Sequence, residues 1–546
     1  MTNKDMTKPV DLQQHAKGTG SLRTQRPVYM DFLPPCNNAC PAGENIQAWL
    51  GLAQEANYEE AWQKLVEENP LPAVHGRVCY HPCETACNRT ATDSPVSIHA
   101  IERYLGDTAL DNQWKIKFNQ YRSGKKVLII GGGPSGLSAA YHLRRFGHEV
   151  EIFEAGPMLG GMLHFGIPAY RLPRHILDAE IQRIVVMGIK VKLNYKVDDI
   201  AKEKVDGGFD AVFIAIGAGL AKKIDIPGQA AVKMMDAVSF LRDVETGNAP
   251  KLGRKVAIYG GGNTAMDAAR TAKRLGAEAF IIYRRDRENM PAHDFEAEEA
   301  LTEGVKINWL RTIKTVEENT FQVEIMEIVD GKLTATGKYE TLEADALIMA
   351  LGQDTDTSFV RKLNGIQFKN DGTVEIDHTM MTGHKGVFAG GDMVPSERTV
   401  TIAVGHGKKA ARYIDGYLKE VDYMKSDKHP IIGADKLHVW YKTIAPQREQ
   451  EMLAAEERAK NFEEVLGGLT TEQALYEAQR CLSCGNCFEC DGCYGSCPED
   501  AVIKLGKGNR YEYDYNKCTG CAVCFEQCPC HAIEMVSEEL VVSYKF

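Results

Sequence analysis

The sequence predicts a multidomain α/β protein whose central part is flanked by two cysteine-rich regions. Three observations predict this class. The chain has 546 residues, a strand, glycine-rich turn and helix follow one another from Lys126 and again from Lys255, and the 16 cysteines gather near the two ends. A chain of this length exceeds one hydrophobic core, and one domain per roughly 100–200 residues predicts about three to five domains.

The composition excludes several classes of protein. Hydrophobic residues make up 44% and charged residues 25%, which is typical of a globular protein. The sequence contains no run of about 18 apolar residues, so it predicts no membrane span. The polar stretch from Met1 to Gln25 lacks the apolar centre of a signal peptide. We therefore expect a soluble, cytoplasmic protein. The net charge of -11 argues against nucleic acid as a partner.

The first glycine-rich turn has the pattern of a dinucleotide site in a Rossmann-like domain. An apolar strand at Lys126–Ile130 runs into G-x-G-x-x-G at Gly131–Gly136 and then into a helical stretch at 137–146. These glycines allow a tight turn and admit a pyrophosphate to the helix N-terminus. The next strand ends at Glu154, which can accept hydrogen bonds from ribose hydroxyls and would repel a 2′-phosphate. The site therefore favours FAD or NAD over NADP, the alternative being a tight turn without a ligand.

A second segment completes the prediction for this site. A strand ends in Gly391 and Asp392, and a helix-prone stretch follows from Thr401. This resembles the flavoproteins with two dinucleotide-binding domains. The resemblance implies that Asp392 binds the flavin ribityl chain and that the helix dipole stabilises negative charge on the reduced ring. The first site is thus predicted to bind FAD, through Gly131, Gly133, Pro134, Ser135, Gly136, Glu154, Gly161, Gly391, Asp392 and Thr401.

The second glycine-rich turn repeats the fingerprint with Ala265 in the third glycine position. The strand that follows ends in Arg284 and Arg285 rather than in an acid. Guanidinium groups bind a 2′-phosphate well, so NADPH is favoured over NADH, the alternative being solvated surface arginines. The residues predicted to bind NAD(P)H are Gly260, Gly262, Asn263, Thr264, Ala265, Arg284 and Arg285.

The cysteines near the N-terminus predict an iron–sulfur domain. Helical patterns at 46–55 and 58–68 lie between them. A disulfide scaffold is typical of small secreted proteins, so metal or cluster ligation is favoured here. Five thiolates suffice for one 4Fe-4S cluster; zinc is the competing interpretation, although no pair has zinc-finger spacing. The five residues are Cys36, Cys40, Cys79, Cys83 and Cys87.

The cysteines near the C-terminus form two bacterial ferredoxin motifs, C-x2-C-x2-C-x3-C-P, and predict a ferredoxin-like α+β domain. The fourth cysteine of each motif serves the other cluster. One cluster is then assigned Cys487, Cys490, Cys493 and Cys528, and the other Cys518, Cys521, Cys524 and Cys497. Cys481, Cys484 and Cys530 are left over, and we expect them to be reduced thiols without a metal. The start C-x2-C-x2-C at Cys481 leaves the ligand register of the first cluster ambiguous.

The strings at 69–79 and 95–103 make a resemblance specific. They are similar to the small subunit of NADPH-dependent glutamate synthase, the large subunit of NADH-dependent ferredoxin:NADP oxidoreductase and the N-terminal part of dihydropyrimidine dehydrogenase. The resemblance implies two N-terminal clusters, one held by three cysteines and a carboxylate, which match Cys40, Cys79, Cys83 and Glu102. Only Cys36 and Cys87 match the other, because the two cysteines expected before Cys36 are missing. We therefore expect one N-terminal cluster.

The strings at 34–41 and 480–491 are most similar to the NAD(P)H:acceptor oxidoreductase associated with dissimilatory sulfite reductase. The resemblance implies an FAD-dependent iron–sulfur NAD(P)H oxidoreductase that exchanges electrons with a protein partner, a larger complex or a ferredoxin. We name no catalytic residue, because the protein need only orient its cofactors and tune their electrostatics. The alternatives are a glutamate synthase small subunit and a non-catalytic electron-wiring subunit. Reaction direction, flavin-based bifurcation and a homo-oligomeric state stay open.

The patterns also predict domain limits. They are 1–122 for the N-terminal helical iron–sulfur domain, 123–250 and 381–420 for the two parts of the FAD-binding domain, 251–380 for the NAD(P)H-binding domain, 421–475 for a helical linker and 476–546 for the ferredoxin-like domain.

Overall fold

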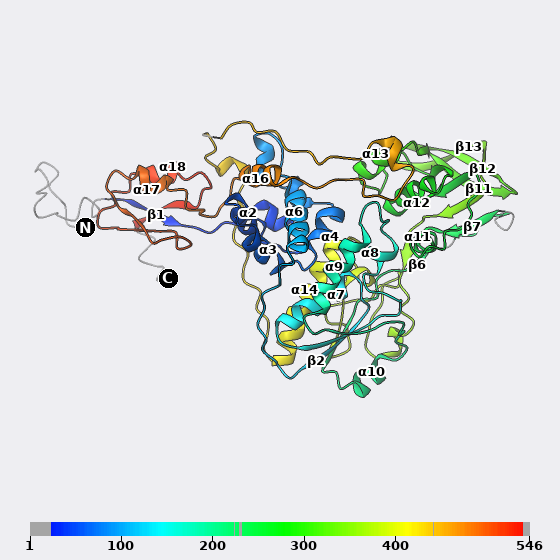
Figure 1. Cartoon of the computed structure of the whole chain (residues 1–546), viewed down its shortest axis with the longest axis horizontal. Coiled ribbons are helices and arrows are strands. Elements are labelled where there is room, and N and C mark those ends of the chain that lie inside the picture. The colour runs from blue at the N-terminus through cyan, green and yellow to red at the C-terminus, as the bar shows by residue number, and fades with distance from the viewer. Residues whose placement is uncertain (1–22, 223, 229–231, 441, 539–546) are drawn as a thin grey trace, which may run out of the picture.

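The computed structural model describes residues 23–222, 224–228, 232–440 and 442–538. Residues 1–22 and 539–546 of the two predicted end domains lie outside this description. Figure 1 shows an elongated molecule, with a small module around α17 (Gly492–Ser496) and α18 (Val523–Glu526) at one end and a β-rich lobe at the other. A helical domain lies between these ends, and a further lobe projects from it.

Short helices pack around two buried tryptophans in the helical domain. Trp49 and Trp62 are fully buried, and truncating such a side chain to alanine costs roughly 3–5 kcal/mol. The two helices predicted here form α2 and α3 almost at the predicted limits. The elements are α1 (Pro35–Ala39), α2 (Ile46–Gln54), α3 (Tyr58–Val66), α4 (Pro72–Val78), α5 (Pro82–Thr85), η2 (Asn88–Ala91) and α6 (Ile98–Asp111).

The first dinucleotide fingerprint lies in a parallel sheet with the strand order β16-β5-β2-β3-β4. Its central strands are apolar because helices cover both faces. The predicted strands at 126–130 and 149–153 form as expected. The strands are β2 (Lys126–Ile130), β3 (Glu149–Phe153), β4 (Lys190–Lys192), β5 (Ala211–Ile214) and β16 (Val387–Ala389). The helices are α7 (Pro134–Arg145), α8 (Met162–Phe165), α9 (Arg174–Val185), α10 (Ile200–Asp206), η4 (Val360–Lys362), η5 (Gly391–Met393) and α14 (Val400–Lys419).

The second fingerprint lies in another parallel sheet, with the order β10-β9-β8-β14-β7. Its edge strand β7 lies before residue 251, the predicted start of this domain. The sequence gives no strand signal there because the side chains of this edge strand are partly exposed and mixed in polarity. The elements are β7 (Lys233–Asp236), α11 (Ala237–Glu245), β8 (Lys255–Tyr259), α12 (Asn263–Arg274), β9 (Glu278–Tyr283), α13 (Asp294–Thr302), β10 (Lys306–Trp309) and β14 (Ala346–Met349).

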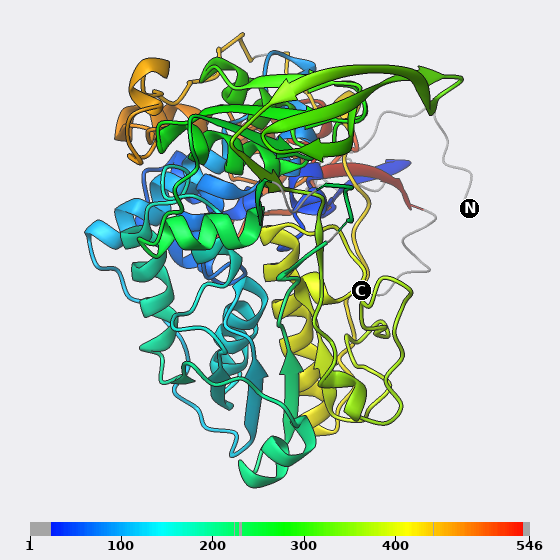
Figure 2. The ribbon, with the colours of Figure 1, turned by 90° about the vertical axis from the view of Figure 1, so that its right-hand side faces the viewer.

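Two antiparallel additions accompany the second sheet. A three-stranded sheet extends from it as a long curved ribbon (Figure 2), and a two-stranded ribbon joins the connections between the two parallel sheets. The strands are β11 (Arg311–Glu317), β12 (Thr320–Val329), β13 (Lys332–Glu343), β6 (Leu220–Ala221) and β15 (Gln353–Asp354).

The charged, Ala- and Glu-rich stretch 447–464 predicts an exposed helix or helical linker, and this prediction is wrong. Only α15 (Ala455–Arg458) forms there, and the rest of the stretch belongs to no helix or named strand. The backbone N–H of Leu453 donates to Val465 O over 2.9 Å, and that of Val465 donates to Tyr170 O over 2.9 Å. These tertiary bonds override the helix propensity of an Ala- and Glu-rich stretch. Among the described residues of the predicted linker, the other elements are η6 (Ala434–Lys436) and α16 (Thr471–Gln479), which begins with a capping box at Thr470 and packs against α2 and α6.

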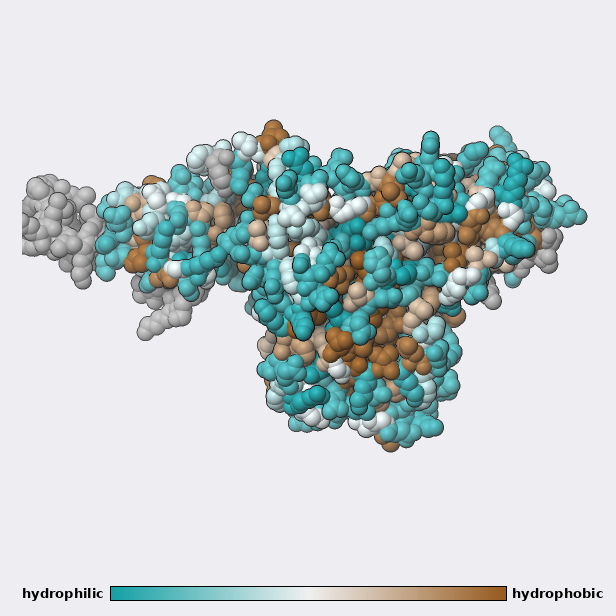
Figure 3. Space-filling model, viewed as in Figure 1, coloured by the Kyte–Doolittle hydropathy of each residue, from teal (hydrophilic) through white to brown (hydrophobic). Residues whose placement is uncertain are grey.

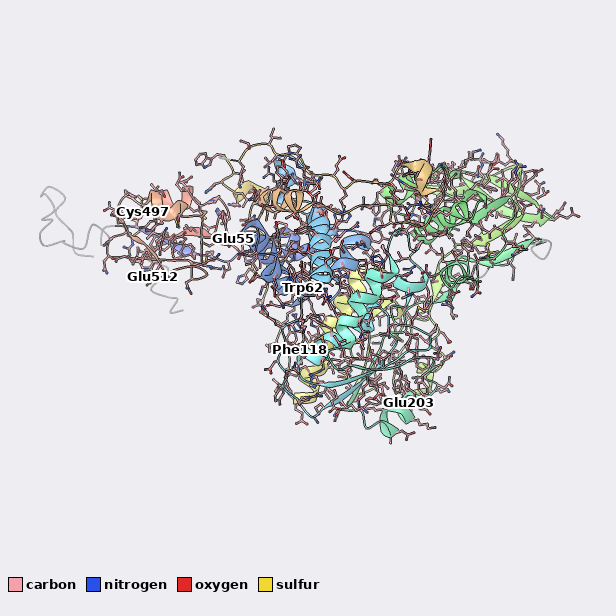
Figure 4. All side chains as sticks on the ribbon, viewed as in Figure 1. Glu55, Trp62, Phe118, Glu203, Cys497 and Glu512 are labelled. Atoms are coloured by element: carbon pink, nitrogen blue, oxygen red, sulfur yellow. The ribbon has the colours of Figure 1, made fainter. Side chains whose placement is uncertain are left out.

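The ferredoxin-like module is built from both ends of the described chain. Strand β1 (Gln25–Tyr29) pairs antiparallel with β19 (Ile533–Ser537), next to the short hairpin of β17 (Val502–Lys504) and β18 (Tyr511–Tyr513). An ion pair of 2.6 Å between Lys507 and Glu55 joins the module to the helical domain, and Figure 4 shows Glu55 on the side of that domain nearest Cys497. Among the described residues, no helix is both long and apolar enough to cross a membrane.

Close contact between α4 and α6 generates a test of this packing. A Cβ added at Gly106 would lie 2.4 Å from the backbone nitrogen of Ala73, whereas a Cβ at Gly51 in α2 meets nothing within 4 Å. We expect Gly106→Ala to lower the stability by about 1–3 kcal/mol through overpacking. Gly51→Ala should leave it unchanged or raise it by up to about 1 kcal/mol, because alanine is the better helix former. Thermal unfolding of the two variants measures the difference, and equal midpoints would contradict the packing.

Candidate functional site

A single large cleft connects the two glycine-rich turns. Figure 3 shows apolar surface where the projecting lobe meets the neighbouring lobe. The cleft is lined by Gly131, Gly133, Pro134, Ser135, Glu154, Gly161, Gly391 and Asp392 from the predicted FAD site, and by Asn263 and Thr264 from the predicted NAD(P)H site. Its lining residues do not include the predicted residues Gly136, Gly260, Gly262, Ala265 and Thr401. Gly136 packs beneath its turn, since a Cβ there would lie 2.0 Å from Gly131 O, and Ala265 is fully buried.

The glycines of both fingerprints fit a bound dinucleotide. The first of each, Gly131 and Gly260, has a positive φ (104° and 149°) and passes close to the carbonyl of Ala215 or Ala350. A side chain there is excluded by the fold alone. At the second, Gly133 and Gly262, a Cβ would meet nothing within 4 Å. Open space beside these two glycines is what an approaching pyrophosphate requires.

The polar groups around the first turn also fit FAD. Glu154 accepts hydrogen bonds from the backbone N–H groups of Gly132 (2.7 Å) and Gly156 (2.6 Å), and its carboxylate keeps further lone pairs for a ribose. The hydroxyl of Ser135 is buried and has no hydrogen-bond partner within the described chain. Burial raises the pKa of the Asp392 carboxyl to about 6, with Arg398 opposing the shift. These are groups that a polar ligand would satisfy.

Residues that the sequence did not indicate close the cleft between the domains. Arg171 forms ion pairs with Asp267 (2.8 Å) and Glu296 (2.6 Å). Burial opposes its charge, but the two carboxylates outweigh burial and hold the pKa of the guanidinium well above its usual value. Tyr80 lies beside this network and accepts a hydrogen bond of 2.5 Å from the Asn263 side chain. No local motif marks these residues, because they meet only when three domains pack together.

Arg284 and Arg285 follow β9 directly and are both exposed. They are not among the residues that line the cleft. Their position at the end of the first strand after the fingerprint is the one that recognises the adenosine ribose in this type of domain.

One group of predicted ligands comes together beside the cleft. The thiol of Cys83 is close enough to Cys40, Cys79 and Glu102 for their charges to add to burial, and together they raise the pKa of this thiol well above its usual value. The hydroxyl of Thr401, at the start of α14, donates a hydrogen bond of 3.0 Å to Cys79 Sγ. Thr401, predicted to contact the flavin, is thus also in contact with this cysteine.

Two acidic side chains near this cysteine group accept hydrogen bonds from the same amide group. The Asn69 side chain donates to Glu102 over 2.8 Å and to Glu44 over 2.9 Å, and it lies 2.8 Å from His75 Nδ1. Burial raises the pKa of Glu44 to about 7 and that of Glu102 well above its usual value, and it lowers the pKa of His75 to about 3. A cation at Glu102 would relieve the cost of burying its charge.

The ferredoxin-like module groups its cysteines in two sets of four. Cys497, Cys518, Cys521 and Cys524 surround one hollow. In the other set, Cys528 is close enough to Cys487, Cys490 and Cys493 for its charge to raise their thiol pKa values, after the larger effect of burial. Each set draws its fourth member from the other motif, the same grouping that the spacing predicts. Cys490 and Cys521 are exposed.

The remaining N-terminal cysteines have partners that the sequence did not indicate. Cys36 and Cys87 line a hollow together with Cys481 and Cys484. The sequence predicts Cys481 and Cys484 to be reduced thiols without a metal. Cys530 belongs to none of these groups. It lies beside Cys528, a member of a set of four, with 3.8 Å between their sulfur atoms.

Comparisons with known proteins agree with this geometry. Residues 125–407 match the family described as pyridine nucleotide-disulphide oxidoreductase, and residues 25–114 match dihydropyrimidine dehydrogenase domain II, 4Fe-4S cluster. The chain is 36% identical to the NADP(+)-dependent formate dehydrogenase subunit beta of Moorella thermoacetica, over 86% of this chain and 73% of that protein. It is 34% identical to the NADPH-Fe(3+) oxidoreductase subunit beta of Geobacter sulfurreducens, over 83% and 75%.

A third relative matches a smaller part of this chain. The glutamate synthase [NADPH] small chain of Azospirillum brasilense is 33% identical, over 71% of this chain and 87% of that protein. The predicted fold class, cofactors and enzyme class are confirmed by these matches together with the two parallel sheets. The chain therefore belongs to the pyridine nucleotide-disulphide oxidoreductase family and is an FAD-dependent iron–sulfur NAD(P)H oxidoreductase.

Proposed function

We propose that this protein oxidises NADPH and delivers the electrons singly to a protein acceptor that docks on the ferredoxin-like module. One observation carries the proposal: the flavin cleft and the first cysteine group share a wall. Val78 and Tyr80 line the cleft on either side of Cys79. The Thr401 hydroxyl, from the helix whose first turn lines the same cleft, donates to the Cys79 sulfur over 3.0 Å.

The bound groups supply the redox chemistry. FAD exchanges hydride with a nicotinamide and also single electrons, and each 4Fe-4S cluster carries one electron. We assign Cys40, Cys79, Cys83 and Glu102 to the cluster beside the cleft. The ferredoxin-like module would hold two clusters on its two sets of four cysteines. Side chains of the protein need not act as acid, base or nucleophile; they orient the nicotinamide and exclude water.

Exposure of the module supports electron exit to a protein. Cys490 and Cys521 are exposed, one in each of the two sets of four, so both predicted clusters reach the surface at the end of the molecule far from the nucleotide cleft (Figure 1). Two relatives are named as beta subunits of larger enzymes. A redox partner subunit or a ferredoxin fits this surface, and a sulfite reductase of the dissimilatory type stays a prediction. None of the 16 cysteines, all within the described residues, forms a disulfide, which fits a reducing compartment such as the cytoplasm.

Anaerobic titration tests the function directly. NADPH should bleach the flavin absorbance and then the broad iron–sulfur absorbance of the purified protein. A protein that keeps both colours with NADPH and with NADH would not be an NAD(P)H oxidoreductase.

Nucleotide choice generates a second test. Replacing Arg284 and Arg285 together by alanine removes the predicted contacts to the 2′-phosphate, which we take to contribute about 1.5–3 kcal/mol in total because both arginines are exposed. We expect KM for NADPH to rise roughly 10- to 100-fold, with little change for NADH. Arg287→Ala is the matched control, because Arg287 is exposed and already paired with Glu298. An equal effect on both nucleotides would remove the argument for NADPH.

The shared wall generates a third test. Thr401→Val keeps the shape but removes the hydrogen bond to Cys79 Sγ, and hydrogen bonds to cluster sulfurs raise reduction potentials. We expect one cluster potential to fall by roughly 20–60 mV, since 59 mV corresponds to a tenfold change for one electron. Potentiometric titration followed by EPR measures this shift. FAD content should stay at the wild-type value, and unshifted potentials for every cluster or a lost flavin would count against the assignment.

A further inference from the structure

The geometry points to a further 4Fe-4S site made by Cys36, Cys87, Cys481 and Cys484, whose ligands come from opposite ends of the chain. These four cysteines line one hollow. From the sequence alone, Cys36 and Cys87 lack two further ligands for a cluster, and Cys481 and Cys484 have no assigned role. The fold brings the two pairs together.

Two helices place half of this site beside the cluster site at the flavin cleft. Cys36 lies one turn before Cys40 on α1, and Cys83 and Cys87 are separated in the same way around α5. Residues four apart lie on one face of a helical turn. Helices α1 and α5 pack against each other, so each contributes one cysteine to each site.

A network of buried hydrogen bonds fixes the other half. The Gln54 side chain in α2 donates to the carbonyl oxygens of Ala478 (3.0 Å) and Cys481 (3.2 Å), and Arg89 donates to Arg480 O over 3.0 Å. On the other side, Phe32 N donates to Gly485 O over 3.1 Å. Cys481 and Cys484 are therefore held against Cys87 and Cys36 by contacts on both flanks.

The hollow has the size of a ferredoxin cluster site in the same molecule. About 370 Å³ of empty space lies within it, compared with about 330 Å³ within the hollow of Cys497, Cys518, Cys521 and Cys524. The sulfur atoms are also similarly arranged. Cys481 Sγ accepts the backbone N–H of the residue two positions later over 3.4 Å, as Cys518 Sγ does.

The sulfur atoms are spread too widely for a single zinc ion. Zinc–sulfur bonds of about 2.3 Å place the sulfurs of a tetrahedral site roughly 3.8 Å apart. Within the described part of the chain, no three of these four sulfurs lie within 4.8 Å of one another, and the same holds for the ferredoxin sets.

Metal analysis of the full-length protein, purified without oxygen, tests the site. The wild type should contain about 16 iron atoms and as many sulfides per chain, four for each of four clusters. Two double variants, Cys36→Ala with Cys87→Ala and Cys481→Ala with Cys484→Ala, should each lose a quarter of the iron and sulfide. Both should lose the same component of the EPR spectrum of the reduced protein, although their substitutions lie at opposite ends of the sequence.

Cys530→Ala is the matched control, a buried cysteine of the same C-terminal segment that is assigned to no site, and it should keep all the iron. FAD content in every variant reports whether the flavin-binding lobe has folded. A wild-type protein with about 12 iron atoms, or with 12 and one zinc, would overturn the proposal whatever the variants do. So would double variants that lose different EPR components, or a C-terminal double variant that keeps its full iron content.

Discussion

The arrangement of this molecule depends on one buried cation, Arg480, which fixes the C-terminal segment to the N-terminal helical domain. Its guanidinium is almost fully buried and donates to Pro95 O, Ser94 O and Ala445 O over 2.7–2.8 Å, and it pairs with Glu477 and Asp93. A buried charge is tolerated only when it is paired and hydrogen-bonded in this way. The residue after it is Cys481, so this satisfied cation also determines where the last cysteine-rich segment begins.

Five pairs of cysteines three or four residues apart are divided between neighbouring proposed sites. The pairs are Cys36 and Cys40, Cys83 and Cys87, Cys484 and Cys487, Cys493 and Cys497, and Cys524 and Cys528. A short helical turn or loop thus keeps two adjacent proposed sites within a few side-chain lengths of each other. Together the five pairs would connect the flavin cleft with the exposed end of the ferredoxin-like module, without a step that depends on a long flexible segment.

Local patterns in the sequence predicted most of the fold and most of the nucleotide site. The strands before Gly131 and Gly260 form at the predicted residues, because a buried parallel strand and its glycine turn are encoded within about ten residues. Features formed by distant segments were not predictable. Cys481 and Cys484 continue the spacing of a ferredoxin motif, which hides their approach to Cys36. Arg171 and Tyr80 belong to no local sequence motif. The 447–464 segment is not the predicted helix, because hydrogen bonds to other segments hold its backbone.

The pairing of β1 with β19 has a consequence for how the protein is made. Because β1 and β19 are neighbours in one small sheet, that sheet cannot form before β19 has been synthesised. The two nucleotide-binding lobes lie between these strands in sequence, so they can fold earlier. Completion of the ferredoxin-like module therefore follows the synthesis of both lobes.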